Sequence, residues 1–157
     1  MTLVEFTDYH CPFCRRHAQN TTPSLIKDYV ETGKIRYGIR ELPLESLHPR
    51  AFKLAQAAIC AGQQGKYWIM HDLFFEKKVT DVDASAKAAK LNMSIFSTCT
   101  NDKAVEKQIR EGIKTAGKLG IRGTPGFILG ETNTNTPNTL HALQSLRGTF
   151  AVRSLSS

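Results

Sequence analysis

Residues 4–17 read VEFTDYHCPFCRRH, and this stretch decides the fold of the chain. At its start, residues 3–7 are apolar, β-branched or aromatic apart from one carboxylate, a composition that predicts a short buried strand. The pattern that follows is helical. Pro12 occupies the place that proline favours in a first turn, where its missing N–H would be unpaired in any case. A strand that leads into a helix at the Cys11-x-x-Cys14 spacing is typical of a redox motif.

The two cysteines of this motif are expected to differ in reactivity. Because the proline between them starts the helix, Cys11 becomes the N-cap and Cys14 lies one turn further along. Unpaired backbone N–H groups and the positive end of the helix dipole face a sulfur at the N-cap and favour the reactive thiolate. Arg15 and Arg16 add positive charge nearby, and His10 is a further candidate. Cys14 is expected to be more buried and to act as the resolving thiol.

A Cys-x-x-Cys pair can also have three other roles. A c-type haem site requires histidine directly after the second cysteine, and Arg15 stands there, which excludes it. A structural zinc site could use Cys11, Cys14, His10 and His17, but it would usually take a second Cys or His pair downstream, and none is arranged that way. An inert structural disulfide is the third alternative. The proline inside the pair and the strand–helix junction favour redox chemistry over the zinc site and the inert bridge.

The composition fits one globular domain and argues against two classes of protein. The chain has 157 residues, of which 41% are hydrophobic and 22% charged. It contains no run of about 18 apolar residues that could span a membrane, and no secretory signal is visible at its start. The net charge of +7 is spread evenly along the chain, so a nucleic-acid-binding stripe is not expected.

The segment after the motif predicts a split helix and a second strand. The helix should run from residue 12 to about residue 30, with Pro23 kinking or splitting it because proline lacks the N–H that a helix interior requires. Gly33 should end it as a left-handed cap. Residues 35–40 alternate apolar and polar side chains and predict a strand. A strand–helix–strand crossover of this length implies that the two strands are parallel.

The middle of the chain is expected to be helical almost throughout. Apolar spacing and the breakers between segments predict helices over 49–61, 66–76, 84–91 and 102–119, with a short turn near 95–99. A glycine-rich loop then leads into a third strand at residues 127–129. Residues 140–148 leave two interpretations open, a helical face with leucines at three-residue spacing or an irregular return strand.

Several segments together resemble the DsbA-like thioredoxin-fold oxidoreductases. They are residues 4–17, LHPRA at 47–51, GKYW at 65–68 with MHD at 70–72, and LGIRGTP at 119–125. They cover most of residues 3–130 in the order of the family. The resemblance implies an α/β chain with a thioredoxin fold and an inserted helical subdomain. Residues 1–48 and 113–157 would form the thioredoxin-like core and residues 49–112 the helical insertion, within one compact domain.

The resemblance also implies roles for the residues of the motif. Cys11 would form a mixed disulfide with a substrate protein, and Cys14 would resolve it. Pro125 would be a cis proline beside the disulfide, where the backbone of Thr124 pairs with an extended substrate segment by strand addition. Phe13 stands where strongly oxidising relatives often carry histidine, so a weaker oxidant is expected. Thr124 and Pro125 stand between two glycines and directly before an apolar strand, and this local sequence is itself compatible with a cis bond.

Glu5 has two interpretations. It lies six residues before Cys11 on an otherwise apolar strand, and it could belong to the solvent face of an exposed edge strand. Alternatively, it is a buried carboxylate near Cys14 that assists proton transfer, like the residue at the matching position of thioredoxin-fold enzymes. We favour the second interpretation and count Glu5 with the two cysteines as catalytic.

Cys60 and Cys99 also leave two alternatives open. Unpaired cysteines are commonly buried as small hydrophobic residues. Relatives with paired cysteines in their insertion helices imply a structural disulfide, which would indicate an oxidising compartment. His17, His48 and His71 are expected to have no catalytic role; His48 is interpreted as a helix-entry residue and His71 as a partly buried helix residue.

The expected function is that of a thiol–disulfide oxidoreductase that exchanges disulfides with protein substrates, most simply as a disulfide oxidase. A disulfide isomerase or reductase is the alternative within the class, and a redox-inactive chaperone that binds extended peptides is the alternative outside it. The expected partners are protein thiols and a membrane or soluble protein that resets the active site, with no nucleic acid. Beyond the redox-active disulfide, no organic cofactor or metal is expected. The resemblance implies a bacterial periplasmic or other extracytoplasmic location.

The chain departs from the family at two places. Relatives usually carry an edge strand before the segment that matches residues 3–7, and this sequence begins too late to contain it. Relatives also end in a long helix after the return strand, whereas only residues 149–157 remain here, barely two helical turns. One sheet edge and the last helix are therefore the least secure parts of the expected fold.

Overall fold

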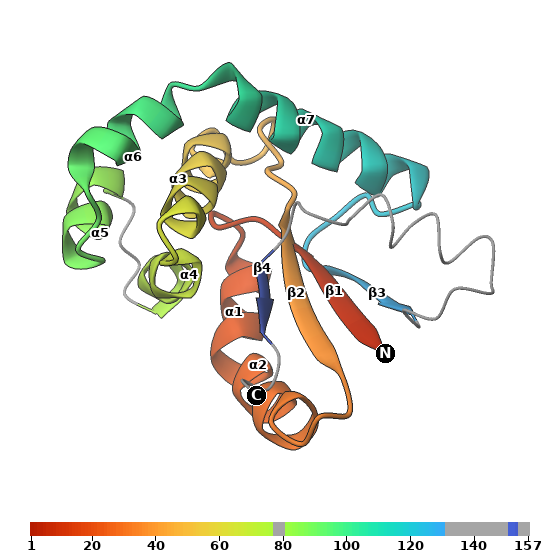
Figure 1. The fold of residues 1–157 in the computed structure, drawn as a ribbon. Helices are drawn as coiled ribbons and strands as arrows, with labels where there is room; N and C mark the ends of the chain where they lie inside the picture. The colour runs from red at the N-terminus through yellow and green to blue at the C-terminus, as the bar shows by residue number, and fades with distance from the viewer. Residues whose placement is uncertain (77–80, 131–150, 154–157) are drawn as a thin grey trace.

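The computed structural model describes residues 1–76, 81–130 and 151–153, and it has a thioredoxin fold built on a four-stranded sheet (Figure 1). The strand order is β3-β1-β2-β4. Strand β1 (Thr2–Thr7) pairs in parallel with β2 (Arg36–Glu41) and antiparallel with β3 (Gly126–Gly130), and β4 (Ala151–Arg153) pairs antiparallel with β2. The three predicted strands and the parallel pairing of the first two are confirmed. Strand β1, which leads into the motif, is therefore paired on both of its edges.

The two faces of β1 contact different helices. Val4 and Phe6 belong to a cluster with Ala116 of α7 (Lys103–Lys118) on one face. Alternation along a strand places Leu3, Glu5 and Thr7 on the opposite face. Leu3 packs there against a larger cluster that contains Cys14 of α1 (Pro12–Asn20) together with Tyr37 and Ile39 of β2. The face of β1 that carries its single carboxylate is therefore the face that α1 covers.

The predicted long helix after Pro12 is split, as expected, but into three pieces. Helix α1 ends at Asn20, a short α2 spans Thr22–Leu25, and a single π-helical turn spans Ile26–Val30. The break falls at Thr21, ahead of Pro23, so that the proline takes a place in the first turn of α2 where it needs no N–H partner. Gly33 follows with a positive φ of 73° and turns the chain toward β2.

Within the described residues, five further helices follow β2. Figure 1 shows α3, α4, α5 and α6 grouped beside the sheet, with α7 extending from them across it. They are α3 (Ala51–Gln63), α4 (Tyr67–Glu76), α5 (Val82–Ala88), α6 (Met93–Thr100) and α7 (Lys103–Lys118). The prediction of only a short turn near 95–99 was wrong, because the Asn92 side chain caps the N-terminus of an eight-residue helix. The expected boundary between residues 112 and 113 falls inside α7, which is one uninterrupted helix.

Capping also explains where α5 differs from its prediction. The Asp81 side chain accepts a hydrogen bond from the Ala84 N–H, so the helix begins at Val82 rather than at residue 84. The helix ends at Ala88, short of residue 91, and Lys90 follows with a positive φ of 54°. A residue whose backbone lies in this left-handed region does not continue a right-handed helix.

The end of the chain also differs from the expectation. Residues 151–153 form strand β4 at the edge of β2, in the segment for which the family comparison implied the remnant of a final helix. Pairing with β4 gives partners to backbone groups of β2 that a bare sheet edge would leave exposed. The two interpretations of residues 140–148 lie outside the described residues. No helix within the described ranges is both long and apolar enough to cross a membrane.

Candidate active site

The site lies where β1 passes into α1, and the cysteines occupy the positions that the spacing predicts. Cys11 is the N-cap of α1, in an extended conformation with φ −72° and ψ 124°, and Pro12 holds the first turn. Cys14 lies one turn along the helix, and both cysteines are free thiols. Cys11 is 4% exposed and Cys14 is fully buried. The Cys11 side chain therefore reaches the edge of the buried region, whereas that of Cys14 does not.

The environment of Cys14 keeps it protonated at neutral pH. The pKa of its thiol is raised to about 12, mainly by burial and to the smallest extent by charge on the Cys11 sulfur. Thr124, Thr7 and the Asp8 N–H, which donates to Cys14 Sγ over 3.5 Å, lower it by less. A buried thiol of this kind reacts as a thiolate only when a neighbouring group takes its proton.

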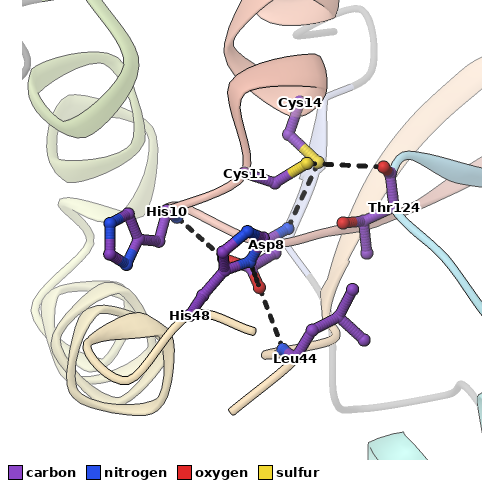
Figure 2. Close-up of polar contacts among 7 residues, drawn as sticks. All are labelled: Asp8, His10, Cys11, Cys14, Leu44, His48 and Thr124. Carbon is purple, nitrogen blue, oxygen red and sulfur yellow. Dashed lines mark hydrogen bonds and ion pairs between the residues drawn. The ribbon is translucent and has the colours of Figure 1, made fainter. Parts of the chain in front are cut away.

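The loop before β3 brings Thr124 and Pro125 to the cysteines. The peptide bond between them is cis, and the Cys11 thiol donates to the Thr124 carbonyl oxygen over 3.5 Å (Figure 2). At Gly126 a Cβ atom would lie only 2.6 Å from the Ile121 side chain, so glycine is required for this close approach. A cavity of about 360 Å³ opens beside the loop, lined by Phe13, Arg16, His17, Thr21, Thr124 and Pro125.

Phe13 separates the two cysteines and points outward. Its side chain is 58% exposed, and the Arg16 guanidinium lies 5.1 Å from the centre of its ring. This is a cation–π contact on the same helix. The residue between the cysteines is therefore an exposed aromatic ring with a positive charge held against it.

Glu5 is buried, so its interpretation as the solvent face of an edge strand is wrong. The residue is 1% exposed because β1 is flanked by two strands and covered on this face by α1. Burial raises the pKa of its carboxyl group to about 7, although hydrogen bonds from Tyr37 and Thr7 lower it. The Tyr37 hydroxyl donates to Glu5 Oε2. The Thr7 hydroxyl is near enough to lower the pKa of both Glu5 and Cys14, but it makes no hydrogen bond among the described residues.

His17 also reaches Glu5, although no catalytic role is predicted for it from the sequence. Its Nε2 atom lies 3.5 Å from Glu5 Oε2, and its ring packs on Phe127 with 4.8 Å between ring centres. Burial lowers the pKa of the imidazole. His17 follows Cys14 by three residues, which places both side chains on one face of α1. That spacing, next to a strand with one carboxylate, is the sequence signal from which the contact could have been anticipated.

Asp8 and His48 form a second contact that sequence reasoning missed. The Asp8 carboxylate is buried and accepts from the N–H of His10 at 2.7 Å and the N–H of Leu44 at 2.9 Å (Figure 2). It also lies 2.8 Å from His48 Nδ1. The Asp8 carbonyl oxygen accepts from the N–H of Cys11 at 3.0 Å. Asp8 therefore ties the loop before Cys11 to the segment that leads into α3.

His71 takes part in a buried polar network away from the cysteines. Its Nδ1 lies 3.3 Å from the Tyr9 hydroxyl, which donates to the Tyr67 hydroxyl over 2.9 Å. Tyr67 in turn donates to Glu41 over 2.6 Å. Burial raises the pKa of Glu41 to about 7. This network joins α4 to β2.

The second pair of cysteines forms a disulfide, which decides between the two alternatives left open. Cys60 of α3 and Cys99 of α6 are bonded, with their Cα atoms 5.7 Å apart. The bridge joins two of the helices grouped beside the sheet. Among the described residues, no three or more His, Cys, Asp and Glu side chains are grouped as metal ligands would be.

Comparisons with known proteins agree with this fold. Residues 1–146 match the family described as thioredoxin. The chain is 31% identical to a sodium/proton antiporter, NhaA 3 of Salinispora tropica, over 149 residues that make up 92% of this chain and 22% of that protein. It is 24% identical to a probable disulfide bond formation protein D of Bacillus anthracis, over 81% of this chain and 64% of that protein. The chain thus spans about a fifth of the length of the antiporters that it matches.

Solved structures include similar molecules. The thiol-disulfide exchange protein α-DsbA2 from Wolbachia pipientis superimposes with a TM-score of 0.70 at 27% identity, over 82% of this chain and 70% of that one.

Proposed function

This chain belongs to the thioredoxin family as a DsbA-like thiol–disulfide oxidoreductase, and we propose that it acts as a disulfide oxidase on protein substrates through Cys11 and Cys14. The observation that carries the proposal is the contrast between the two thiols. Cys11 lies at a helix N-terminus beside an open cavity, whereas Cys14 is buried and strongly favours its protonated form. Such a pair gives one sulfur that substrates reach and one that only its neighbour reaches.

The proposed reaction starts from the oxidised pair. A substrate thiolate attacks Cys11 Sγ, a new sulfur–sulfur bond forms, and the bond between Cys11 and Cys14 breaks with its electron pair going to Cys14. A second substrate thiolate then attacks the substrate sulfur of this mixed disulfide. The substrate disulfide forms, Cys11 leaves as a thiolate, and the substrate has lost two electrons to the enzyme pair.

The helix N-terminus favours this direction. The unpaired N–H groups and the dipole of α1 stabilise a thiolate at Cys11, which makes it a good leaving group in the last step. The first step leaves the electron pair on Cys14, whose burial disfavours a charge. Glu5, with a pKa raised to about 7, is the buried acid that we propose protonates this sulfur, acting through the Thr7 hydroxyl.

Thr124 and Pro125 are proposed to bind the substrate. The Thr124 carbonyl oxygen faces the Cys11 sulfur, and β3 begins directly after Pro125. An extended substrate segment that crosses the cavity could pair with the backbone of this loop while its cysteine meets Cys11. Phe13 and Arg16 line the same cavity and would contact side chains on either side of the substrate cysteine.

The remaining parts of the proposal concern partners and location. A membrane or soluble redox protein must reoxidise the pair after each cycle, and no cofactor other than the disulfide is involved. The Cys60–Cys99 bridge supports an oxidising, extracytoplasmic location, because such bonds are rarely kept in reducing compartments. Ion transport is not part of the proposal, since the likeness to antiporters covers about a fifth of their length.

A reductase or isomerase is the second candidate, favoured by one observation. Phe13 carries no charge to stabilise the Cys11 thiolate, which makes the pair a weaker oxidant than relatives with histidine at this position. A redox-inactive peptide-binding chaperone is the less favoured alternative. It would bind substrates at Pro125 and would not need two free cysteines at the helix N-terminus.

The proposal is tested by transferring the disulfide to a reduced, unfolded protein. The oxidised chain is mixed with reduced ribonuclease A, and recovery of ribonuclease disulfides is followed by alkylation and mass spectrometry. Stoichiometric transfer is expected from the oxidised chain. In the Cys14→Ser variant, whose Cys11 thiol is first activated with Ellman's reagent, the substrate thiolate should displace thionitrobenzoate and leave a trapped mixed disulfide on Cys11. Binding of the substrate without any transfer would overturn the oxidase proposal and favour the chaperone.

A further inference from the structure

Two pairs of polar side chains face each other between β1 and α1. Glu5 and Thr7 are two residues apart on one face of the strand, and Cys14 and His17 are three residues apart on one face of the helix. The Thr7 hydroxyl lowers the pKa of the Cys14 thiol, and His17 Nε2 lies 3.5 Å from Glu5 Oε2. The four side chains therefore form a row that starts at the buried sulfur and ends at the imidazole.

The buried carboxyl group needs a route by which protons enter and leave. Glu5 is 1% exposed, and Tyr37, whose hydroxyl donates to it, is fully buried. The His17 side chain is 13% exposed and lines the cavity beside Pro125. Within the row, His17 is thus the group that reaches solvent. Glu5 Oε1 and His17 Nε2 are both buried with no hydrogen-bond partner among the described residues, so each has capacity for a proton or a bridging donor.

We propose that His17 is the proton exit of the active site, passing protons between the buried Glu5 carboxyl group and the cavity beside Pro125. This inference rests on the proposed function, because it concerns how Cys14 gains and loses its proton. In this row, Glu5 is the group that exchanges a proton with Cys14 by way of Thr7. His17 is therefore a proton-relay residue that acts through the Glu5 carboxylate.

The relay balances the thiol chemistry. When the bond between Cys11 and Cys14 breaks, the electron pair goes to the Cys14 sulfur, which takes a proton from Glu5 by way of the Thr7 hydroxyl. Glu5 is then a carboxylate, and His17 returns a proton to it from solvent. In the reverse direction, Cys14 attacks Cys11 Sγ of the mixed disulfide, and the bond from Cys11 to the substrate sulfur breaks with its electron pair going to that sulfur. The proton that Cys14 loses then moves outward along the same row.

The groups around His17 suit transfer in both directions. Burial raises the pKa of Glu5 to about 7, which brings the carboxyl group into the range where it exchanges protons near neutral pH, and it lowers the pKa of His17, which favours a neutral imidazole that can both accept and donate a proton. Glu5 is the ionisable group that faces His17 from β1, with Tyr37 of β2 behind it. From β3, the neighbour is the uncharged ring of Phe127. On α1 itself, the Arg16 guanidinium lies over the Phe13 ring.

The test is the single-turnover reduction of the Cys11–Cys14 disulfide by dithiothreitol, with acid quenching and mass spectrometry between pH 5.5 and 8.5. His17→Gln keeps a polar side chain but cannot titrate, and it should slow the reaction near pH 7 by about tenfold. In His17→Ala, added imidazole should restore most of the rate. Asn20→Ala, at the exposed end of the same helix, is the matched control. It should keep the wild-type rate near pH 7, and added imidazole should not change that rate.

The outcomes separate this inference from the function on which it rests. A His17→Gln rate within twofold of the wild-type rate across this pH range, or no response of His17→Ala to imidazole, would overturn the relay. Because dithiothreitol reduces the pair whichever direction operates in the cell, the relay can be supported even if disulfide transfer to ribonuclease fails. Failure of transfer with an intact relay would instead overturn only the oxidase direction.

Discussion

The chain carries two pairs of cysteines that are equally buried and chemically opposite. Cys11 and Cys14 are 4% and 0% exposed, and Cys60 and Cys99 are 0% and 6% exposed. All four belong to the same hydrophobic cluster. Yet the first pair consists of free thiols and the second is a disulfide. Burial by itself therefore does not decide which cysteines do chemistry.

The neighbours of each pair make the difference. Cys60 lies within α3 between Ile59 and Ala61 and bonds to Cys99 near the end of α6. Cys11 instead caps a helix and faces a carbonyl oxygen, and Cys14 lies near an N–H group and near the hydroxyls of Thr7 and Thr124, which lower the pKa of its thiol. In the proposed mechanism the helix end stabilises the leaving thiolate, and the Glu5 carboxyl group supplies the proton that thiol exchange needs.

The largest effect should come from the first pair. Cys11→Ser should abolish disulfide transfer, with a loss of at least about a thousandfold, because the attacked sulfur is removed. Cys14→Ser, with its Cys11 thiol first activated by Ellman's reagent, should instead accumulate a mixed disulfide with the substrate, because the substrate thiolate displaces thionitrobenzoate and no Cys14 thiol resolves the product. Non-reducing electrophoresis of the reaction with reduced ribonuclease distinguishes the two variants. Equal loss without any trapped adduct in Cys14→Ser would contradict the assignment of Cys11 as the attacked sulfur.

The second pair should affect stability and leave chemistry alone. Cys60 and Cys99 are 39 residues apart, and a loop of this length corresponds to about 4 kcal/mol of stabilisation in the chain-entropy treatment. The double variant Cys60→Ser/Cys99→Ser should lose roughly this free energy of unfolding, as measured by urea denaturation. Its single-turnover exchange rate under native conditions should stay within about twofold of the wild type. A tenfold slower exchange in the folded variant would contradict the claim that the second pair affects stability alone.

Two buried carboxyl groups sharpen the contrast, Glu5 of β1, which His17 of α1 contacts, and Glu41 of β2, which Tyr67 of α4 contacts. Burial raises the pKa of both Glu5 and Glu41 from 4.5 to about 7. The folded state therefore binds more protons than the unfolded state between these values, so stability is full below about pH 4.5 and falls as the pH rises to about 7. Each rise corresponds to at most about 3 kcal/mol.

Glutamine variants separate the two groups. Glu41→Gln should flatten this fall in stability, followed by urea denaturation at a series of pH values, and should leave the pH profile of exchange unchanged. Glu5→Gln should flatten the fall and also alter the exchange profile, because it removes the proton donor of Cys14. An unchanged exchange profile in Glu5→Gln would refute the proposed role of this residue.

The smallest effect concerns the loop before Cys11. Asp8→Asn leaves one acceptor oxygen for the three donors that surround the carboxylate, which include the N–H groups of His10 and Leu44. It should cost about 1–2 kcal/mol of unfolding free energy by thermal or urea denaturation. Exchange should slow by only a few-fold, since Asp8 positions the loop. An effect on exchange as large as that of Glu5→Gln would place Asp8 in the proton pathway.

Local patterns in the sequence accounted for the reactive pair better than for its surroundings. The strand before Cys11, the helix that starts at Pro12 and the parallel return to β2 follow from short-range signals. The contacts of Asp8 with His48, 40 residues away, and of Glu5 with Tyr37 depend on how the elements pack. Similarly, β4 forms because β2 offers an edge, a property of the sheet that residues 151–153 do not display by themselves.

The reduction potential of the Cys11–Cys14 pair tests the central claim most directly. The whole chain is equilibrated in glutathione buffers of graded ratio and alkylated, and the peptide that carries both cysteines is quantified by mass spectrometry. The oxidase account predicts a potential closer to the value of about −120 mV found for DsbA than to the value of about −270 mV found for thioredoxin. A potential near −270 mV would contradict it and identify the chain as a reductant.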